Sequence, residues 1–263
     1  MSAPSIIAAI DSKGVARLTL NRPQVRNALD EVMIADLSQA FARWSQETAV
    51  RAVVVDGAGE AFCAGEDLGM MRRVAAYSAS EKKNDARRLA HLLKAIHDCE
   101  KPTIALVHGA SFSAGCGLMA ACDIAIAADD CTFSIADARW GVAPAVIAPY
   151  LLRAIGERNA RRFFLTAERF DAESARRIGL AHMIAMRSRL EATLSALLAA
   201  ILECGPDAQR ETKALIRSLA GRPISDSLME ESAAAIARIR SSAEAKEGIN
   251  AFLEKRAPAW RKE

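Results

Sequence analysis

Long hydrophobic runs are missing from this sequence. No stretch reaches the roughly 18 apolar residues that a bilayer-spanning helix needs, so we expect no membrane-spanning segment. The opening residues, MSAPSIIAAID, carry no basic n-region and no long apolar stretch, so we expect no signal peptide. A strong charge of either sign is missing too, because the formal net charge is +3 and acids and bases are interleaved. We therefore expect neither a membrane nor a nucleic-acid partner.

Paired cysteines are also missing. None of the six cysteines forms a C-x-x-C pair or has a histidine at metal-ligand spacing, so the sequence predicts no metal site. Most of them lie among Ala, Ile and Met, which favours buried, reduced thiols and a cytoplasmic protein. The six are Cys63, Cys99, Cys116, Cys122, Cys131 and Cys204.

Strand and helix patterns alternate through the first half of the chain. Apolar periodicity predicts helices beginning after the N-cap residue Asp30, around 89–96 and at 115–122. Period-two alternation and short β-branched runs predict strands at 16–20, 51–56, 103–107 and 124–127. This alternation is typical of α/β architecture.

Helical periodicity dominates the second half. It predicts helices at 190–204, 207–219 and 224–240, separated by Gly205-Pro206 and by Gly221–Pro223. We therefore divide the 263 residues into an α/β core, 1–200, and a C-terminal helical region, 201–263.

Two segments rich in small residues follow predicted strands. Phe62–Leu68 and His108–Leu118 would let the backbone approach a ligand closely. If the Ser113 side chain caps the following helix, the N–H groups of Ala114 and Gly115 are free at its positive end and suit a developing oxyanion. The alternative for each segment is a tight turn that only packs a strand against a helix.

Five stretches carry a resemblance to a known family. They are LTLNRPQVRNAL (18–29), AVRAVVVDGAGEAFCAGEDL (49–68), KPTIALVHGASFSAGCGLMAACDIAIA (101–127), FLTAERFDAESARRIGL (164–180) and EGINAFLEKRAPAW (247–260). These stretches follow one another in the order of the crotonase superfamily, the enoyl-CoA hydratase/isomerase family, and the chain resembles that family. The resemblance implies a crotonase-like core of ββα units coiled into a superhelix and a C-terminal helical region for trimerisation. It also implies an acyl-CoA substrate, a homotrimer or a hexamer built as a dimer of trimers, and no metal or redox cofactor.

The resemblance assigns an oxyanion hole and one acid/base residue. The hole is formed by the N–H of Glu66, after Ala-Gly in the first segment, and by the N–H of Ala114. Of the family's two carboxylates, one is absent because Gly117 holds its position. The other corresponds to Asp137, which is one methylene shorter than the usual glutamate and so moves the carboxylate by roughly 1.5 Å. A surface or capping aspartate is the alternative for Asp137.

The resemblance also implies substrate-binding positions. Arg26 matches a basic residue that meets the CoA phosphates, while Phe252 and Lys255 match residues that reach CoA on a neighbouring subunit. A surface arginine and an ordinary amphipathic helix are the alternatives. The full substrate-binding set is Arg26, Ala28, Ala64, Asp67, Leu68, Gly117, Trp140, Phe252 and Lys255.

The stretch 140–156 most resembles methylglutaconyl-CoA hydratase-like proteins, in which glycine also tends to stand where Gly117 stands here. We therefore expect hydration of an α,β-unsaturated acyl-CoA, possibly branched or of glutaconyl type. Isomerisation of an enoyl-CoA is the enzymatic alternative, and an acyl-CoA-binding relative with weak or no catalysis is the non-enzymatic one.

Overall fold

The main sheet of the protein has six strands in the order β1-β2-β3-β4-β6-β9. The computed structural model describes residues 3–261. Residues 1–2 of the predicted core and residues 262–263 of the predicted C-terminal region lie outside the described part. β1 is antiparallel to β2, and every other neighbouring pair is parallel. The strands are β1 (Ile6–Ile10), β2 (Val15–Leu20), β3 (Ala52–Gly57), β4 (Thr103–Val107), β6 (Ile124–Ala128) and β9 (Met183–Ala185).

A smaller sheet lies beside the first. It contains β5 (Ala110–Phe112), β7 (Thr132–Ser134) and β8 (Phe170–Asp171), with β5 parallel to β7 and β7 antiparallel to β8. Cys63 adds an isolated parallel bridge to Ser111. The long strands β3, β4 and β6 are thus each followed by a short extended segment and then by helix, which confirms the predicted ββα arrangement.

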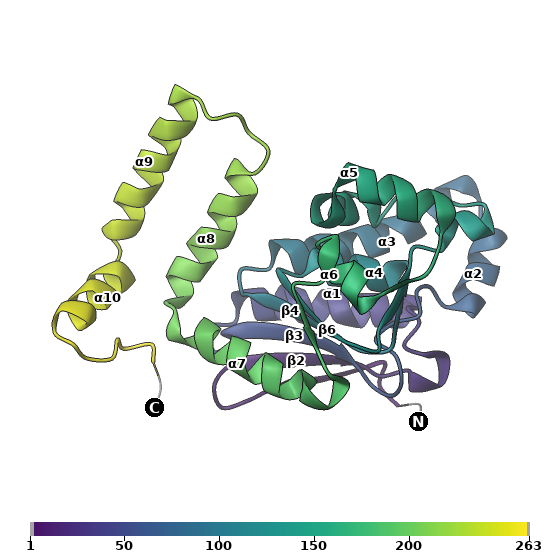
Figure 1. Ribbon diagram of the computed structural model, residues 1–263, viewed down its shortest axis with the longest axis horizontal. Coiled ribbons are helices and arrows are strands. Elements are labelled where there is room, and N and C mark those ends of the chain that lie inside the picture. The colour runs from purple at the N-terminus through teal and green to yellow at the C-terminus, as the bar shows by residue number, and fades with distance from the viewer. Residues whose placement is uncertain (1–2, 262–263) are drawn as a thin grey trace.

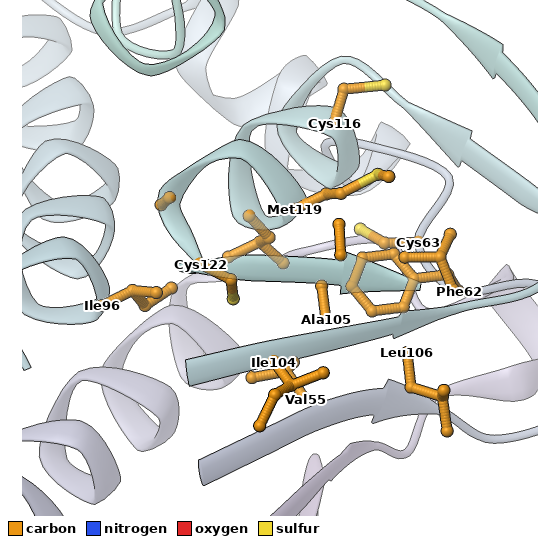
Figure 2. Packing of buried hydrophobic residues seen from close by; sticks show 14 of the residues in the cluster. Val55, Phe62, Cys63, Ile96, Ile104, Ala105, Leu106, Cys116, Met119 and Cys122 are labelled. Carbon is orange, nitrogen blue, oxygen red and sulfur yellow. The ribbon is translucent and has the colours of Figure 1, made fainter. Parts of the chain in front are cut away.

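Helices enclose the main sheet (Figure 1). Asp30 caps α1 by accepting the Met33 N–H at 2.9 Å, as the sequence predicts. α4 packs on β4, and Figure 2 shows Met119 and Cys122 of α4 in one apolar layer with side chains of the strands. The helices of the core are α1 (Glu31–Gln46), α2 (Leu68–Ala75), α3 (Ala79–Asp98), α4 (Ala114–Ala121), α5 (Ala148–Thr166) and α6 (Ala172–Arg177).

The last helices leave the core. α7 (Leu190–Glu203) still contacts β3 and β6, but α8 (Pro206–Leu219), α9 (Asp226–Arg240) and α10 (Ala243–Leu253) extend away from the sheet (Figure 1). α8 buries no residue, and α9 and α10 bury one each. Their exposed apolar side chains are Ile216, Met229, Ile236, Ile249, Phe252 and Leu253. A single chain thus leaves the apolar surface of these helices uncovered.

Most cysteines are buried, as the residues around them in the sequence predict. Five of the six thiols are buried and unpaired, and Cys204 is exposed. Within residues 3–261 there is no helix that combines the length and the apolar character needed to cross a bilayer.

Candidate active site

The first small-residue segment crosses close to the second. The Phe62 N–H donates to the His108 carbonyl at 2.8 Å, and the Cys63 N–H donates to the Ala110 carbonyl at 3.1 Å. Gly65 has a φ of +98°, and a Cβ there would lie 3.2 Å from the Phe112 carbonyl oxygen. Glycine is therefore required where the chain turns toward Glu66.

The second segment is held against the first at the start of α4. The Phe112 N–H donates to the Cys63 carbonyl at 2.9 Å. A Cβ on Gly115 would lie 2.5 Å from that same carbonyl oxygen, so only glycine permits this approach. The small residues that the sequence pattern singles out are thus needed for the contact between the two segments.

The two predicted oxyanion donors lie at helix starts. Ala114 is the first residue of α4, and Glu66 comes two residues before α2. Within residues 3–261, neither the Glu66 N–H nor the Ala114 N–H donates a hydrogen bond to a protein atom. Unpaired N–H groups at the positive ends of helices suit an oxygen that gains negative charge.

Ser113 departs from its predicted role. It occupies the N-cap position of α4, but its side chain makes no cap hydrogen bond. Instead its hydroxyl accepts the Ala136 N–H at 3.1 Å, and its own N–H donates to the Ser134 carbonyl at 2.8 Å. The backbone of Ser113, at φ +41° and ψ −104°, turns the hydroxyl toward the Asp137 segment. The cap prediction was therefore wrong, because the hydroxyl joins two segments instead.

Asp137 begins the 3₁₀ turn η2 (Asp137–Trp140), directly after the residue that Ser113 holds. Its Oδ2 atom is buried and has no hydrogen-bond partner among residues 3–261. A buried carboxylate oxygen without a donor is uncommon in proteins and indicates a place for a proton or a ligand.

Ile147 fills the space beside Gly117. A Cβ on Gly117 would lie 2.4 Å from Ile147 Cγ2 and 3.7 Å from Leu93 Cδ1. The position of the family's first carboxylate is therefore not an open gap, because an apolar side chain occupies it. A second carboxyl group in the active site, beside that of Asp137, would have to come from an element other than α4.

Two polar residues to which the sequence gave no role hold the first segment in place. Asn27 is completely buried, and its amide donates to the carbonyls of Ala58 and Ala61, both at 2.8 Å. Its side-chain oxygen accepts the Arg22 N–H at 2.8 Å. No spacing rule marks an asparagine in a turn as buried, so this role could be found only in the structure.

Arg22 links the caps of two helices. Its guanidinium contacts Asp30 at 3.1 Å and Asp67 at 3.0 Å. Asp67 caps α2 by accepting the Met70 N–H at 3.0 Å, so the helix begins directly after it. Although burial acts in the opposite direction, the Met70 N–H and the Arg22 guanidinium hold the pKa of Asp67 below its usual value.

The structure brings most of the predicted substrate-binding residues to this region. The Ala64 N–H donates to the Arg26 carbonyl at 2.9 Å, and Ala28 is buried in the same turn. The Arg26 side chain is exposed and pairs with no group in residues 3–261. Leu68 and Trp140 are exposed apolar residues, at 64% and 61%.

Phe252 and Lys255 are not brought to the site within one chain. Phe252 lies in α10 and is 82% exposed, and Lys255 follows that helix. α10 and α2 lie at opposite ends of the long axis of the molecule (Figure 1). Within one chain, the helix that carries Phe252 therefore lies far from α2 and the site beside it.

The chain matches known proteins over nearly its whole length. The sequence model of the family Enoyl-CoA hydratase/isomerase matches residues 11–263. A Thermus thermophilus protein named "Putative enoyl-CoA hydratase" is 33% identical over 251 residues, covering 95% of this chain and 99% of that protein. Crystal structures of enoyl-CoA hydratases give similar agreement. The one from Shewanella pealeana has a TM-score of 0.94 and 38% identity, covering 97% of this chain and 96% of its own. The one from Mycobacterium smegmatis has a TM-score of 0.93 and 34% identity, covering 99% of this chain and 100% of its own.

The family match extends through both small-residue segments and the C-terminal helices, and the fold agrees at these TM-scores. The chain therefore belongs to the enoyl-CoA hydratase/isomerase family, is an enzyme of that family, and has the crotonase fold.

Proposed function

We propose that the protein adds water to an α,β-unsaturated acyl-CoA. The observation that carries this proposal is that, within residues 3–261, the N–H groups of Glu66 and Ala114 and a buried oxygen of Asp137 have no partner. The bond between Ser113 and Ala136 holds the residues before Ala114 and Asp137 together. The two N–H groups donate hydrogen bonds to the thioester carbonyl oxygen. Since this oxygen carries more negative charge in the enolate than in the substrate, the two hydrogen bonds stabilise the transition state more than the ground state.

Asp137 moves the proton in this proposal. Its carboxylate takes a proton from water as the oxygen adds to the β-carbon, and a proton reaches the α-carbon of the enolate. The reaction needs no metal or redox cofactor, and coenzyme A takes part only as a portion of the substrate. Arg26, Ala28, Ala64, Asp67 and Leu68 line the CoA side of the site, where the free guanidinium of Arg26 suits a phosphate.

A branched or glutaconyl-type acyl group is the finer part of the proposal. It rests on the resemblance of residues 140–156 to methylglutaconyl-CoA hydratase-like proteins and on the exposed Trp140 after η2. Trp140 supplies an apolar wall on the acyl side, while Gly117, under Ile147, leaves no polar side chain there.

Isomerisation of an enoyl-CoA is the second candidate, because it needs the same oxyanion hole and a single base. The filled space beside Gly117 favours it, since one carboxylate of the usual pair is missing. The same feature, with the shortened Asp137, favours a binding protein with weak catalysis as the non-enzymatic candidate.

The proposed working form is a cytoplasmic homotrimer or a dimer of trimers. The uncovered apolar surface of α8–α10 supports an assembly, as does the position of α10 at the opposite end of the molecule from α2 (Figure 1). In the assembly, Phe252 and Lys255 would contact CoA bound to a neighbouring subunit.

The test is turnover of crotonyl-CoA and 3-methylglutaconyl-CoA by the purified protein, beside Asp137→Ala. Products are identified by mass, because hydration adds one water and isomerisation adds none. We expect a hydrated product and a loss of turnover on the order of a hundredfold or more in the variant. Binding of CoA thioesters without turnover of either substrate would reject the hydratase proposal, and full turnover by Asp137→Ala would reject the role of Asp137.

A further inference from the structure

Glu66 lies across the start of α4 from Asp137. Cys63 bridges Ser111, and Ser111 pairs with Phe133, so three extended segments run parallel in this order. Gly65 lies against Ser113, because a Cβ on Gly65 would be 3.7 Å from the Ser113 Cβ, and the Ser113 hydroxyl accepts the Ala136 N–H at 3.1 Å. Glu66 follows Gly65 and Asp137 follows Ala136, so Ser113 stands between the two segments that carry these acids. Their carboxyl groups are close enough for the charge of Asp137 to act on Glu66.

The Glu66 carboxyl group is available to a ligand. Within residues 3–261 it forms no hydrogen bond and no ion pair. The residue as a whole is exposed, yet its carboxyl group lies among protein atoms and near two other acids. Burial, and then the charges of Asp137 and Asp85, raise its pKa above the usual value.

The surroundings of Glu66 favour a bound proton. Asp85 of α3 is buried, and its own pKa is raised, chiefly by burial, although Arg88 opposes this effect. The basic groups that act on Asp85 are themselves engaged with acids, since Arg88 contacts Asp85 at 3.5 Å and Arg73 of α2 pairs with Glu31 of α1 at 2.7 Å. Nearby negative charge favours the protonated form of a carboxyl group, which is the form that a proton donor needs.

We propose that Glu66 supplies the second acid/base group of the active site, taking the place of the carboxylate that Gly117 lacks. Glu66 then has two separate functions, because its main-chain N–H holds the enolate oxygen and its carboxyl group donates a proton to the α-carbon. Asp137 accepts the proton that water releases as its oxygen bonds to the β-carbon. Each turnover moves one proton to Asp137 and one from Glu66, and exchange with solvent restores both groups. This inference rests on the proposed hydration.

The experiment compares Glu66→Gln with wild type, Asp137→Asn and the control Glu60→Gln. Glu60 lies in the same loop, and its side chain is 93% exposed. Glutamine keeps the size of the side chain and the main-chain N–H. We expect Glu66→Gln to bind butyryl-CoA as wild type does, and kcat for crotonyl-CoA to fall about a hundredfold, a typical contribution of a general acid. Glu60→Gln should retain wild-type turnover.

Two further readouts separate a proton donor from a structural residue. Butyryl-CoA in D₂O should exchange its α-protons with wild type and with Asp137→Asn, but not with Glu66→Gln. The kcat of wild type should fall as pH rises through the pKa of Glu66, since only the protonated acid donates, and Glu66→Gln should lose this decline. Wild-type hydration or α-proton exchange in Glu66→Gln would overturn the role of Glu66 while leaving the hydratase proposal intact. A wild-type protein that hydrates no enoyl-CoA would overturn both.

Discussion

The Ser113 hydroxyl accepts the Ala136 N–H at 3.1 Å, and this bond ties the residue before α4 to the residue before Asp137. The proposed oxyanion donor Ala114 and the proposed base Asp137 are therefore held by neighbouring residues. Ser113→Ala removes the acceptor and allows the Asp137 segment to move. Because a shift of about 1 Å can cost on the order of a hundredfold in rate, we expect kcat to fall by one to two orders of magnitude.

Ser113→Gly serves as the matched variant for Ser113→Ala, because it also removes the hydroxyl group. Ser113 has a φ of +41°, which a residue without a Cβ tolerates better, so the glycine variant should be more stable to urea than Ser113→Ala. Both should lose kcat equally, because both lack the hydroxyl, and KM should change little because the Ala114 N–H remains. Wild-type kcat in either variant would show that the hydroxyl does not position Asp137.

The second prediction concerns the space shared by Gly117 and Ile147. A Cβ on Gly117 would meet Ile147 Cγ2 at 2.4 Å, so Gly117→Ala should lower the free energy of unfolding by about 1–3 kcal/mol. Ile147→Ala removes that atom and should cost about 2–4 kcal/mol by leaving a cavity. The double variant should be more stable than the sum of the two losses predicts. Strictly additive losses in urea unfolding would contradict a shared space.

The sequence predicted several regular elements correctly because their signals are local. The alternation of residues 16–20 and the β-branched run 51–56 correspond to β2 and β3, and Asp30 caps α1. The helix α5 and the strand β1 were not predicted. The β1 residues Ile6–Ile10 are largely exposed, so the strand depends on pairing with β2 and shows little hydrophobic pattern.

The site could be predicted only in part, because its details depend on contacts between distant residues. The resemblance placed Glu66, Ala114 and Asp137 in the site, but no residue pattern shows that the Ser113 side chain bonds to Ala136 instead of capping α4. Nor does the sequence show that Ile147 covers Gly117. Both facts follow from the meeting of β5, β7 and the start of α5, which tertiary structure alone determines.

The third prediction is a loss of stability in acid that depends on Asp67. Its pKa lies below the ordinary value of 3.8 in the folded chain, so the ionised group stabilises the fold above that pH. The stabilisation is lost as pH falls through the folded pKa. Asp67→Asn keeps the cap on α2 but not the charge, so its deficit relative to wild type should be present near neutral pH and should shrink below about pH 3.8. Asp67→Ala also loses the cap and should cost about 1–2 kcal/mol at neutral pH. A deficit of Asp67→Asn that stays constant down to the acid transition would argue against this charge effect.

The last prediction concerns the uncovered end of α10. Phe252 and Leu253 are 82% and 70% exposed in one chain, a degree of exposure that a second copy of the protein would relieve. We expect wild type to sediment as a trimer or as twice a trimer, and Phe252→Ser with Leu253→Ser to shift the protein toward smaller species. The same double variant should raise KM for CoA thioesters, because Phe252 then no longer reaches a neighbouring site. The control is Leu165→Ser at the end of α5, where the side chain is 78% exposed but lies outside the C-terminal helices. If the double variant keeps both the sedimentation coefficient and the KM of wild type, α10 takes no part in assembly or in CoA binding.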